Sequence, residues 1–232
     1  MVDKTNLVVI PARKNSKRLP GKNLLKVGGI SLLERTLKFA KQTGFNVLVS
    51  TDCEIMQEIS LKHKVYCPWL RPEYLSNDTA KSVDVIFHAL DWYENNINKV
   101  NNILLLQPTS PFRDIKYFEF ANSKLQSNNS IESFVSVSLM HQSPFWNFYV
   151  RDGLLSPVLD LSGVNIRSQD LEKTYNLNGN MYLIRAKSLK EKKQFITEHT
   201  RPIIMDDKIY SVDIDEPYDY ELANIIAKEW NI

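Results

Sequence analysis

The chain has 232 residues and a formal net charge of only +2, so its composition gives no support to a broad nucleic-acid-binding or membrane-binding surface. This length suits one large α/β domain, alone or with a subdomain, and can bury a sizeable core. The two cysteines, Cys53 and Cys67, lie in no metal-type spacing and define no disulfide framework. With no leader pattern and no run of the roughly 18 apolar residues that span a bilayer, the protein is expected to be cytoplasmic, with reduced thiols.

Short apolar runs alternate with helical periodicity along the first part of the chain. Apolar residues on one face predict helices that start near Ser31 and that include 83–90 and 118–125. This alternation predicts βαβ units and a mostly parallel sheet, and continuously apolar strands favour a sheet covered on both faces. The predicted strands are 7–10, 47–50, a weak one at 65–67, 103–107 and 134–137.

The pattern breaks between residues 141 and 178, where aromatic residues are frequent and no helical period is seen. Exposed as a flap, this segment would leave an apolar patch, and such patches usually mark interfaces. We therefore predict a dimerisation arm, with an ordinary subdomain packed on its own chain as the alternative. Beyond it, strands are predicted at 180–184, 203–205 and 210–215, and a helix from Pro217 to about Trp230.

The loop after the first strand carries the strongest chemical signal. Residues 10–23 read IPARKNSKRLPGKN and hold five cations. Ligands of open α/β sheets bind at the carboxyl ends of the strands, so this charge predicts a polyanion such as a nucleoside triphosphate. The loop lacks both GxxxxGK[ST] and GxGxxG, which excludes a Walker P-loop and a dinucleotide fingerprint. A solvated basic turn is the alternative.

The two ends of the chain have opposite charge. Residues 1–26 hold seven cations against Asp3, and residues 200–232 hold eight acids against three cations. The ends either meet in one site or form two solvated faces. Asp213 and Asp215 would point to the same face of an extended segment, and two such carboxylates suit Mg²⁺, whereas a surface strand end is the alternative.

Five segments, in order, resemble motifs of the CMP-sialic acid synthetase (acylneuraminate cytidylyltransferase) family, and together they cover nearly the whole chain. They are IPARKNSKRLPGKN at 10–23, RPEYLSNDT at 71–79, LQPTSPFR at 106–113, RSQDLEKTYNLNG at 167–179 and SVDID at 211–215.

This resemblance implies a nucleotidyltransferase with a Rossmann-like fold, a mostly parallel sheet with helices on both faces and a protruding dimerisation arm. It implies a single cytidylyltransferase domain over 1–232, with 141–178 as an inserted arm for dimerisation and sugar binding. CTP and a nine-carbon 2-keto-3-deoxy sugar acid, sialic, legionaminic or related, would give a CMP-sugar and pyrophosphate with Mg²⁺, for surface polysaccharide biosynthesis. The implied partners are these substrates and a second copy of the chain, with no nucleic acid and no membrane.

The resemblance also carries residue roles over by position. The triphosphate and the α-phosphate would be held by Arg13, Ser16, Lys22 and Asn23. The cytosine side would be contacted by Arg71 and Ser82, and Gln107 would face both nucleotide and sugar. The sugar acid would meet Arg167, Gln169, Tyr175 and Asn178, some of them across a dimer interface. Asp213 and Asp215 would bind Mg²⁺, and the catalytic set would be Arg13, Lys22, Gln107, Asp213 and Asp215.

Two departures from the family pattern stand out. Lys14 and Asn15 replace glycines of the first loop, so Asn15 is expected to take a positive φ and Lys14 to point outward. Asn180 replaces an alanine and is expected near the sugar side chain, which leaves sialic, legionaminic and pseudaminic acids open. Asp213 or Asp215, through a metal-bound water, is expected to accept the sugar proton. Arg167 is expected to pair with the sugar carboxylate, with Lys173 as the alternative.

Three other functions stay open. A sugar-1-phosphate nucleotidyltransferase would also begin with a strand and a basic loop, but its usual glycine-rich GxGTR-type loop is absent. A metal-dependent GT-A glycosyltransferase would use an Asp-x-Asp pair, although in mid-chain. A non-catalytic nucleotide-sugar-binding protein would keep a relic site.

Overall fold

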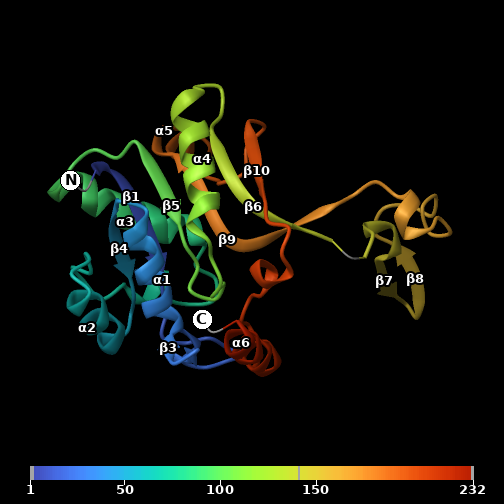
Figure 1. Cartoon of the computed structure of the whole chain (residues 1–232), viewed down its shortest axis with the longest axis horizontal. Helices are drawn as coiled ribbons and strands as arrows, with labels where there is room; N and C mark the ends of the chain where they lie inside the picture. The colour runs from blue at the N-terminus through green and yellow to red at the C-terminus, as the bar shows by residue number, and fades with distance from the viewer. Residues whose placement is uncertain (1–2, 141, 231–232) are drawn as a thin grey trace.

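A computed structural model describes residues 3–140 and 142–230. One six-stranded sheet forms the body, in the order β10-β6-β9-β5-β1-β4. Only β9 runs antiparallel to its neighbours; the other pairs are parallel. Figure 1 shows helices on both sides of this sheet, as predicted. The strands are β1 (Asp3–Pro11), β4 (Phe45–Ser50), β5 (Asn102–Leu105), β6 (Ser133–Leu139), β9 (Tyr175–Arg185) and β10 (Thr200–Ile204).

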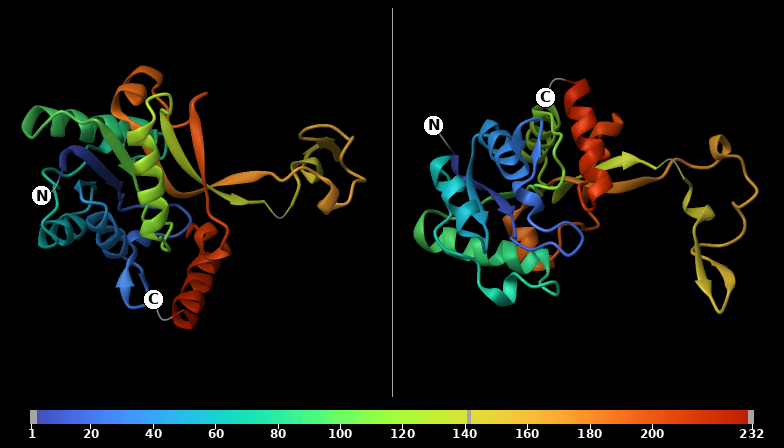
Figure 2. Two further views of the ribbon diagram at one scale, coloured as in Figure 1. Left: turned by 45° about the horizontal axis from the view of Figure 1, so that its top comes forward. Right: turned by 90° about the horizontal axis from the view of Figure 1, so that it is seen from below.

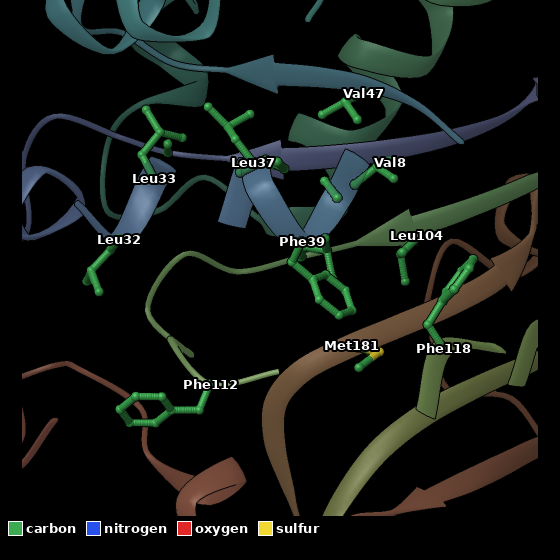
Figure 3. Packing of buried hydrophobic residues seen from close by; sticks show 14 of the residues in the cluster. Val8, Leu32, Leu33, Leu37, Phe39, Val47, Leu104, Phe112, Phe118 and Met181 are labelled. Carbon is green, nitrogen blue, oxygen red and sulfur yellow. The ribbon is translucent and has the colours of Figure 1, made fainter. Parts of the chain in front are cut away.

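Each face of the sheet has its own hydrophobic core. Val8 and Ile10 of β1 belong to the core with α1, α4 and α6, whereas Leu7 and Val9 belong to the core with α3 and α5. Side chains alternate between the faces of a strand, so a continuously apolar run is buried on both sides. Figure 3 shows the first core, where α1 and α4 meet the sheet. The helices are α1 (Leu32–Gln42), α2 (Glu54–Lys62), α3 (Ser82–Asn96), α4 (Ile115–Ser127), α5 (Ala186–Lys192) and α6 (Pro217–Glu229).

The connection from β1 to α1 shapes one side of the site. It contains the 3-10 turn η1 (Lys22–Leu24) and the short hairpin of β2 (Lys26–Val27) and β3 (Ile30–Ser31). Ser31 then starts α1 with a capping box, its Oγ accepting from the Glu34 backbone N–H at 3.2 Å. The predicted helix start near Ser31 is therefore confirmed.

Two predicted strands are wrong. Residues 65–67 form only an isolated bridge, between Leu48 and Tyr66. Residues 210–215 contain no strand, because the 3-10 turn η5 (Lys208–Ser211) occupies their start. Asp207 caps that turn by accepting from the Ile209 backbone N–H at 3.1 Å. The remaining predicted strands lie within β1, β4, β5, β6, β9 and β10 or overlap them by all but one or two residues.

The described part of the arm, residues 142–178, projects from the body on a stalk formed by β6 and β9 (Figures 1 and 2). Phe145 packs closely on Gly163 within the arm, since a methyl group built on Gly163 would lie only 2.4 Å from the Phe145 ring. Val150 and Leu154 remain 75% and 73% exposed. The arm is thus not a subdomain packed on its own body. Its elements are η3 (Pro144–Trp146), β7 (Phe148–Arg151), β8 (Leu154–Pro157), η4 (Ser168–Asp170) and the start of β9.

Within residues 3–140 and 142–230, no helix combines the length and apolar character needed to cross a bilayer. Cys53 and Cys67 are both buried and unbonded, and burial raises the pKa of the Cys67 thiol to about 11. Both thiols are therefore structural side chains of the core rather than reactive groups.

Candidate active site

A cleft of about 350 Å³ opens where β1 and β5 end and α3 begins. This is the edge at which parallel α/β sheets bind ligands. An adjoining cavity of about 440 Å³ shares Arg13, Asn77 and Asp78 with it and adds Ser16. The cleft is lined by Pro11, Arg13, Lys22, Asn23, Arg71, Leu75, Asn77, Asp78, Ala80, Ser82, Val85, Gln107, Pro108, Thr109, Asp213 and Asp215.

The basic loop is held in place by its backbone and by Asn23. Asn23 is buried, and its Nδ2 donates to the Arg13 carbonyl at 3.0 Å. The Lys14 backbone N–H donates to Asp52 Oδ1 at 2.6 Å, and the Lys14 side chain is exposed as expected. Gly21 supplies the turn with φ +69°, whereas Asn15 does not adopt a positive φ, so that expectation is wrong. The tight bend of the loop therefore lies at Gly21, six residues after Asn15.

The two charged ends of the chain meet in this cleft. Lys22 Nζ lies 2.7 Å from Asp215 Oδ1 and donates to the Ile214 carbonyl at 3.2 Å. Arg18 forms a second ion pair with Asp215. Although desolvation acts in the opposite direction, these cations lower the pKa of Asp215. Of the two alternatives for the charged ends, the structure shows that they meet in one cleft rather than form two separate faces.

A second carboxylate, Asp78, holds the outer part of the loop. It pairs with Arg13 at 2.8 Å and with Lys17 at 2.9 Å, and the hydrogen bonds from Lys17 and Arg13 lower its pKa. All three side chains are accessible to solvent. These pairs are therefore weak enough for a phosphate to exchange with the carboxylate.

Arg71 brings a buried cation to the cleft. Its residue is 6% exposed, and burial lowers its pKa, with Asp52 acting in the opposite direction. The Nε donates to Ser76 Oγ at 3.3 Å, but the buried Nη2 makes no hydrogen bond to the described residues. Nη2 lies 3.9 Å from Asp52 Oδ1, an ion pair too long to be a hydrogen bond, so this buried donor fits an acceptor on a ligand. Ser82, also in the lining, is the first residue of α3.

Gln107 follows β5 and is fixed through its main chain. Arg113 Nη2 donates to the Gln107 carbonyl, and Arg113 Nε donates to the Asn180 carbonyl at 3.1 Å. Burial lowers the pKa of Arg113 to about 9, with the charge of Asp213 acting in the opposite direction. The guanidinium thus ties the loop after β5 to β9 and leaves the Gln107 side chain in the cleft.

Asp213 fits a cation-binding role. Its carboxylate is open to the cleft on one side, yet desolvation by surrounding atoms and the nearby charge of Asp215 raise its pKa. Among the described residues it has no ion-pair partner within 4 Å. No group of three or more His, Cys, Asp or Glu side chains gathers as a metal site in the described ranges. A metal here would therefore need substrate oxygens and water besides Asp213 and Asp215, which is the coordination Mg²⁺ favours.

The residues predicted to meet the sugar lie elsewhere. Arg167, Gln169 and Tyr175 are exposed on the arm and line neither cavity. Asn178 is buried, its Nδ2 donating to Ser138 Oγ at 3.0 Å. Asn180 is also fully buried, and its Nδ2 donates to the Phe112 carbonyl at 2.6 Å. Because Asn180 is buried and lines neither cavity, the expectation that it lies beside the sugar is wrong for the cavities that this chain forms by itself.

Sequence reasoning missed several residues that the structure brings to the cleft. Asp78 and Thr109 both lie inside segments that carry the family resemblance, but neither was given a role. Asp78 follows Arg71, which was predicted at the nucleotide, by seven residues, and this was the available signal for Asp78. Thr109 accepts from the Ile214 backbone N–H at 2.8 Å through its carbonyl, a long-range contact without a local signal.

A basic loop and an acidic pair facing each other across the carboxyl edge of a parallel sheet define a nucleotidyltransferase of the α/β class. The profile of the Cytidylyltransferase family matches residues 7–221, and the chain belongs to that family.

Similar proteins agree with this assignment. CMP-N,N'-diacetyllegionaminic acid synthase of Legionella pneumophila is 34% identical over 94% of each chain. Pseudaminic acid cytidylyltransferase of Campylobacter jejuni is 28% identical over 96% of each chain. N-acylneuraminate cytidylyltransferase of Streptococcus agalactiae is 31% identical, and the match covers 92% of this chain and 51% of that protein. The solved structure of CMP:2-keto-3-deoxy-manno-octonic acid synthetase with CTP superposes with a TM-score of 0.69 at 17% identity, over 97% and 99% of the two chains. That likeness confirms the fold.

Proposed function

We propose that this enzyme joins the CMP moiety of CTP to a nine-carbon 2-keto-3-deoxy sugar acid and releases pyrophosphate. The contact of Lys22 with Asp215 supports the proposal, because it brings the cations proposed to bind phosphate and the carboxylates proposed to bind Mg²⁺ into one cleft. The names of the three relatives add a substrate class: diacetyllegionaminic acid, pseudaminic acid and N-acylneuraminate. The preferred sugar within this class is to be found by assay.

The nucleotide would occupy the cleft and its adjoining cavity. Arg13, Ser16, Lys22 and Asn23 would hold the triphosphate, with the Arg13 fork exchanging Asp78 for phosphate oxygens. Arg71 and Ser82 would contact the cytosine side.

The reaction is an in-line displacement at phosphorus. The anomeric hydroxyl oxygen attacks the α-phosphorus, the bond to the β-phosphate oxygen breaks, and pyrophosphate leaves with its electron pair. Lys22 and Arg13 would stabilise the charge that develops on the leaving group, and Gln107 would orient the reacting atoms. Asp213 or Asp215 would accept the proton of the sugar hydroxyl. Asp213 and Asp215 would hold Mg²⁺, which would supply positive charge for the α-phosphate and the leaving pyrophosphate.

A homodimer would complete the sugar site. The arm extends away from the body (Figure 2) and exposes apolar side chains. Arg167 and Gln169, which belong to the arm, line neither the cleft nor its adjoining cavity. We therefore propose that each arm packs on a second copy and brings Arg167 to the sugar carboxylate in the partner's cleft, with Gln169 and Tyr175 beside it. Asn178 would act from within, by holding β9.

Subunit mixing tests this arrangement. Arg167→Ala and Lys22→Ala chains, each inactive as a pure dimer, are co-expressed with different tags. Heterodimers then hold one intact site, and random pairing restores about a quarter of wild-type activity. Activity that stays at the level of the pure variants would mean that Arg167 serves its own chain or no site.

Pyrophosphate release tests the activity itself. CTP is offered with N-acetylneuraminic, legionaminic and pseudaminic acids, with sugar 1-phosphates, and alone. We expect release only with a sugar acid. Release with a sugar 1-phosphate would assign the rival nucleotidyltransferase activity, and CTP binding without release would favour a non-catalytic protein. Because both thiols are free and buried and the reaction consumes CTP, we propose that it takes place in the cytoplasm.

A further inference from the structure

The side-chain amide of Gln107 lies against a glycine of β9. Gly179 has φ +72°, and a methyl group built on it would lie 2.9 Å from Gln107 Oε1 and 3.0 Å from Ser110 Oγ. Real Cβ atoms do not approach oxygens this closely, so any side chain at this position would move the amide. The Gln107 amide thus lies where a side chain at position 179 would have to be.

A bulge in β9 brings Gly179 to this position. Val135 pairs with Tyr182 and Val137 with Leu177, so β9 has extra residues between these two pairs. Ser136 fills the gap: its Oγ accepts from the Met181 backbone N–H at 2.8 Å.

Buried side chains fix the bulge from within. The Asn178 carboxamide donates to Ser138 and accepts from the Asn180 backbone N–H at 3.1 Å. Asn178 and Asn180 are 4% and 0% exposed. The backbone of β9 beside Gln107 is therefore held by buried side-chain hydrogen bonds, although Asn180 Oδ1 accepts none from the described residues.

Arg113 holds the other end of the glutamine. Its guanidinium donates both to the Gln107 carbonyl and to the carbonyl of Asn180, the residue that follows Gly179. The Arg113 side chain thus fixes the distance between the Gln107 main chain and the segment of β9 that contains Gly179.

We propose that Gly179 is a positioning residue that, by lacking a side chain, fixes where the Gln107 amide meets the reacting groups. The inference rests on the proposed function, in which Gln107 faces the α-phosphate and the sugar. An alanine at 179 would be accommodated mainly by rotation of the flexible end of Gln107. Its effect therefore falls on turnover more than on folding.

A matched glycine separates this effect from backbone strain. Gly44 has φ +73°, and a methyl group built on it would meet nothing within 4 Å. Gly44→Ala therefore carries the same kind of strain as Gly179→Ala without the contact to Gln107.

The test is a double-mutant cycle over wild type, Gly179→Ala, Gln107→Ala and the double variant, with Gly44→Ala as control. We expect Gly179→Ala to lower kcat by about tenfold or more, and to change it less than twofold when Gln107 is already alanine. Gly44→Ala should keep wild-type kcat. Equal losses in both backgrounds, or wild-type kcat in Gly179→Ala, would overturn the inference.

Two readouts do not depend on turnover. The Gln107 side-chain NH₂ signals, assigned by their loss in Gln107→Ala, should shift in Gly179→Ala and stay unchanged in Gly44→Ala. Unshifted signals would overturn the inference even for a protein that uses no sugar acid. Should Gly179→Ala fold poorly, Gln107→Ala vacates the space for the methyl group, so the double variant should recover thermal stability. An equal loss of Tm in both backgrounds would again contradict the contact.

Discussion

Lys22 Nζ and Asp215 Oδ1 lie 2.7 Å apart, although the two residues are 193 positions apart in the chain. The Lys22 side chain is only 13% exposed, so this contact fixes the basic loop against the segment before α6. The ligand-binding edge is therefore formed by the first and the last parts of the chain together, and neither part forms it alone.

Lys22→Ala removes the cation between the phosphate loop and the acidic pair. We expect kcat/KM for CTP to fall on the order of 10²-fold, because a preorganised charge at the leaving group is lost. Lys26→Ala is the matched control: Lys26 is exposed, lines neither cavity, and should change little. Equal activity of the two variants would remove Lys22 from the site.

Arg13→Ala should raise the KM for CTP and lower kcat, because the guanidinium that now pairs with Asp78 would contact the triphosphate. Lys14→Ala, one residue away and exposed, should behave like wild type. Initial rates over a CTP range at fixed sugar acid measure both. A change confined to the KM of the sugar acid would mean that the loop is misassigned.

Asp215→Asn keeps the shape of the side chain and removes its charge. We expect turnover to fall on the order of 10²-fold and the Mg²⁺ concentration for half-maximal rate to rise, while Tm changes little. Asp206→Asn, an exposed residue outside both cavities, is the control. Near-normal activity of Asp215→Asn at limiting Mg²⁺ would contradict the metal role.

The exposed hairpin of the arm should hold the proposed dimer together. Leu154→Asp with Leu155→Asp places charge on side chains that are 73% and 69% exposed in the single chain. Sedimentation velocity should show a monomer that has also lost sugar-dependent turnover. Ile55→Asp, 57% exposed on α2, should remain dimeric. A charged hairpin that leaves the dimer intact would place the interface elsewhere.

Glu94 should contribute stability that depends on pH. Its carboxylate binds Lys190 at 2.7 Å and accepts from the Val100 backbone N–H at 3.1 Å. Although desolvation acts in the opposite direction, these bonds lower its pKa in the folded protein below 4.5. A lowered folded-state pKa means that the contribution is present above about pH 4.5 and is lost as the pH falls through the folded-state value.

The variant Glu94→Gln measures that contribution. It should destabilise the protein by about 1 kcal/mol at pH 7, and by progressively less as the pH falls below 4.5. Urea unfolding of both proteins across this range checks the sign. A difference that grows as the pH falls would contradict it.

Much of the fold was predictable because the local signals agree with the tertiary structure. Four apolar residues in β1 predict a strand buried on both faces, and the Ser31 capping box predicts the start of α1. At 210–215 the alternation of Tyr210, Val212 and Ile214 is typical of a strand, but the cap from Asp207 forms a 3-10 turn instead.

The candidate site was predictable where the charge of a side chain indicates what it binds. The cations and carboxylates predicted at the nucleotide and the metal, Arg13, Lys22, Arg71, Asp213 and Asp215, all line the cleft, whereas Arg167 lies on the arm. The positions of Asn178 and Asn180 could not be predicted, because an amide side chain is equally suited to a ligand-binding cleft and to a buried hydrogen-bond network. Only the long-range partners, Ser138 and the Phe112 carbonyl, decide between the two.

One cleft is proposed to join a cytidine nucleotide to a sugar acid. Phosphorus NMR of a mixture of enzyme, CTP, Mg²⁺ and each sugar acid tests it most directly. We predict that the triphosphate resonances give way to a phosphodiester resonance and to pyrophosphate with at least one nonulosonic acid, and that Lys22→Ala greatly slows this change. Unchanged CTP with every sugar acid, or cleavage that yields CMP without a phosphodiester, would contradict the account.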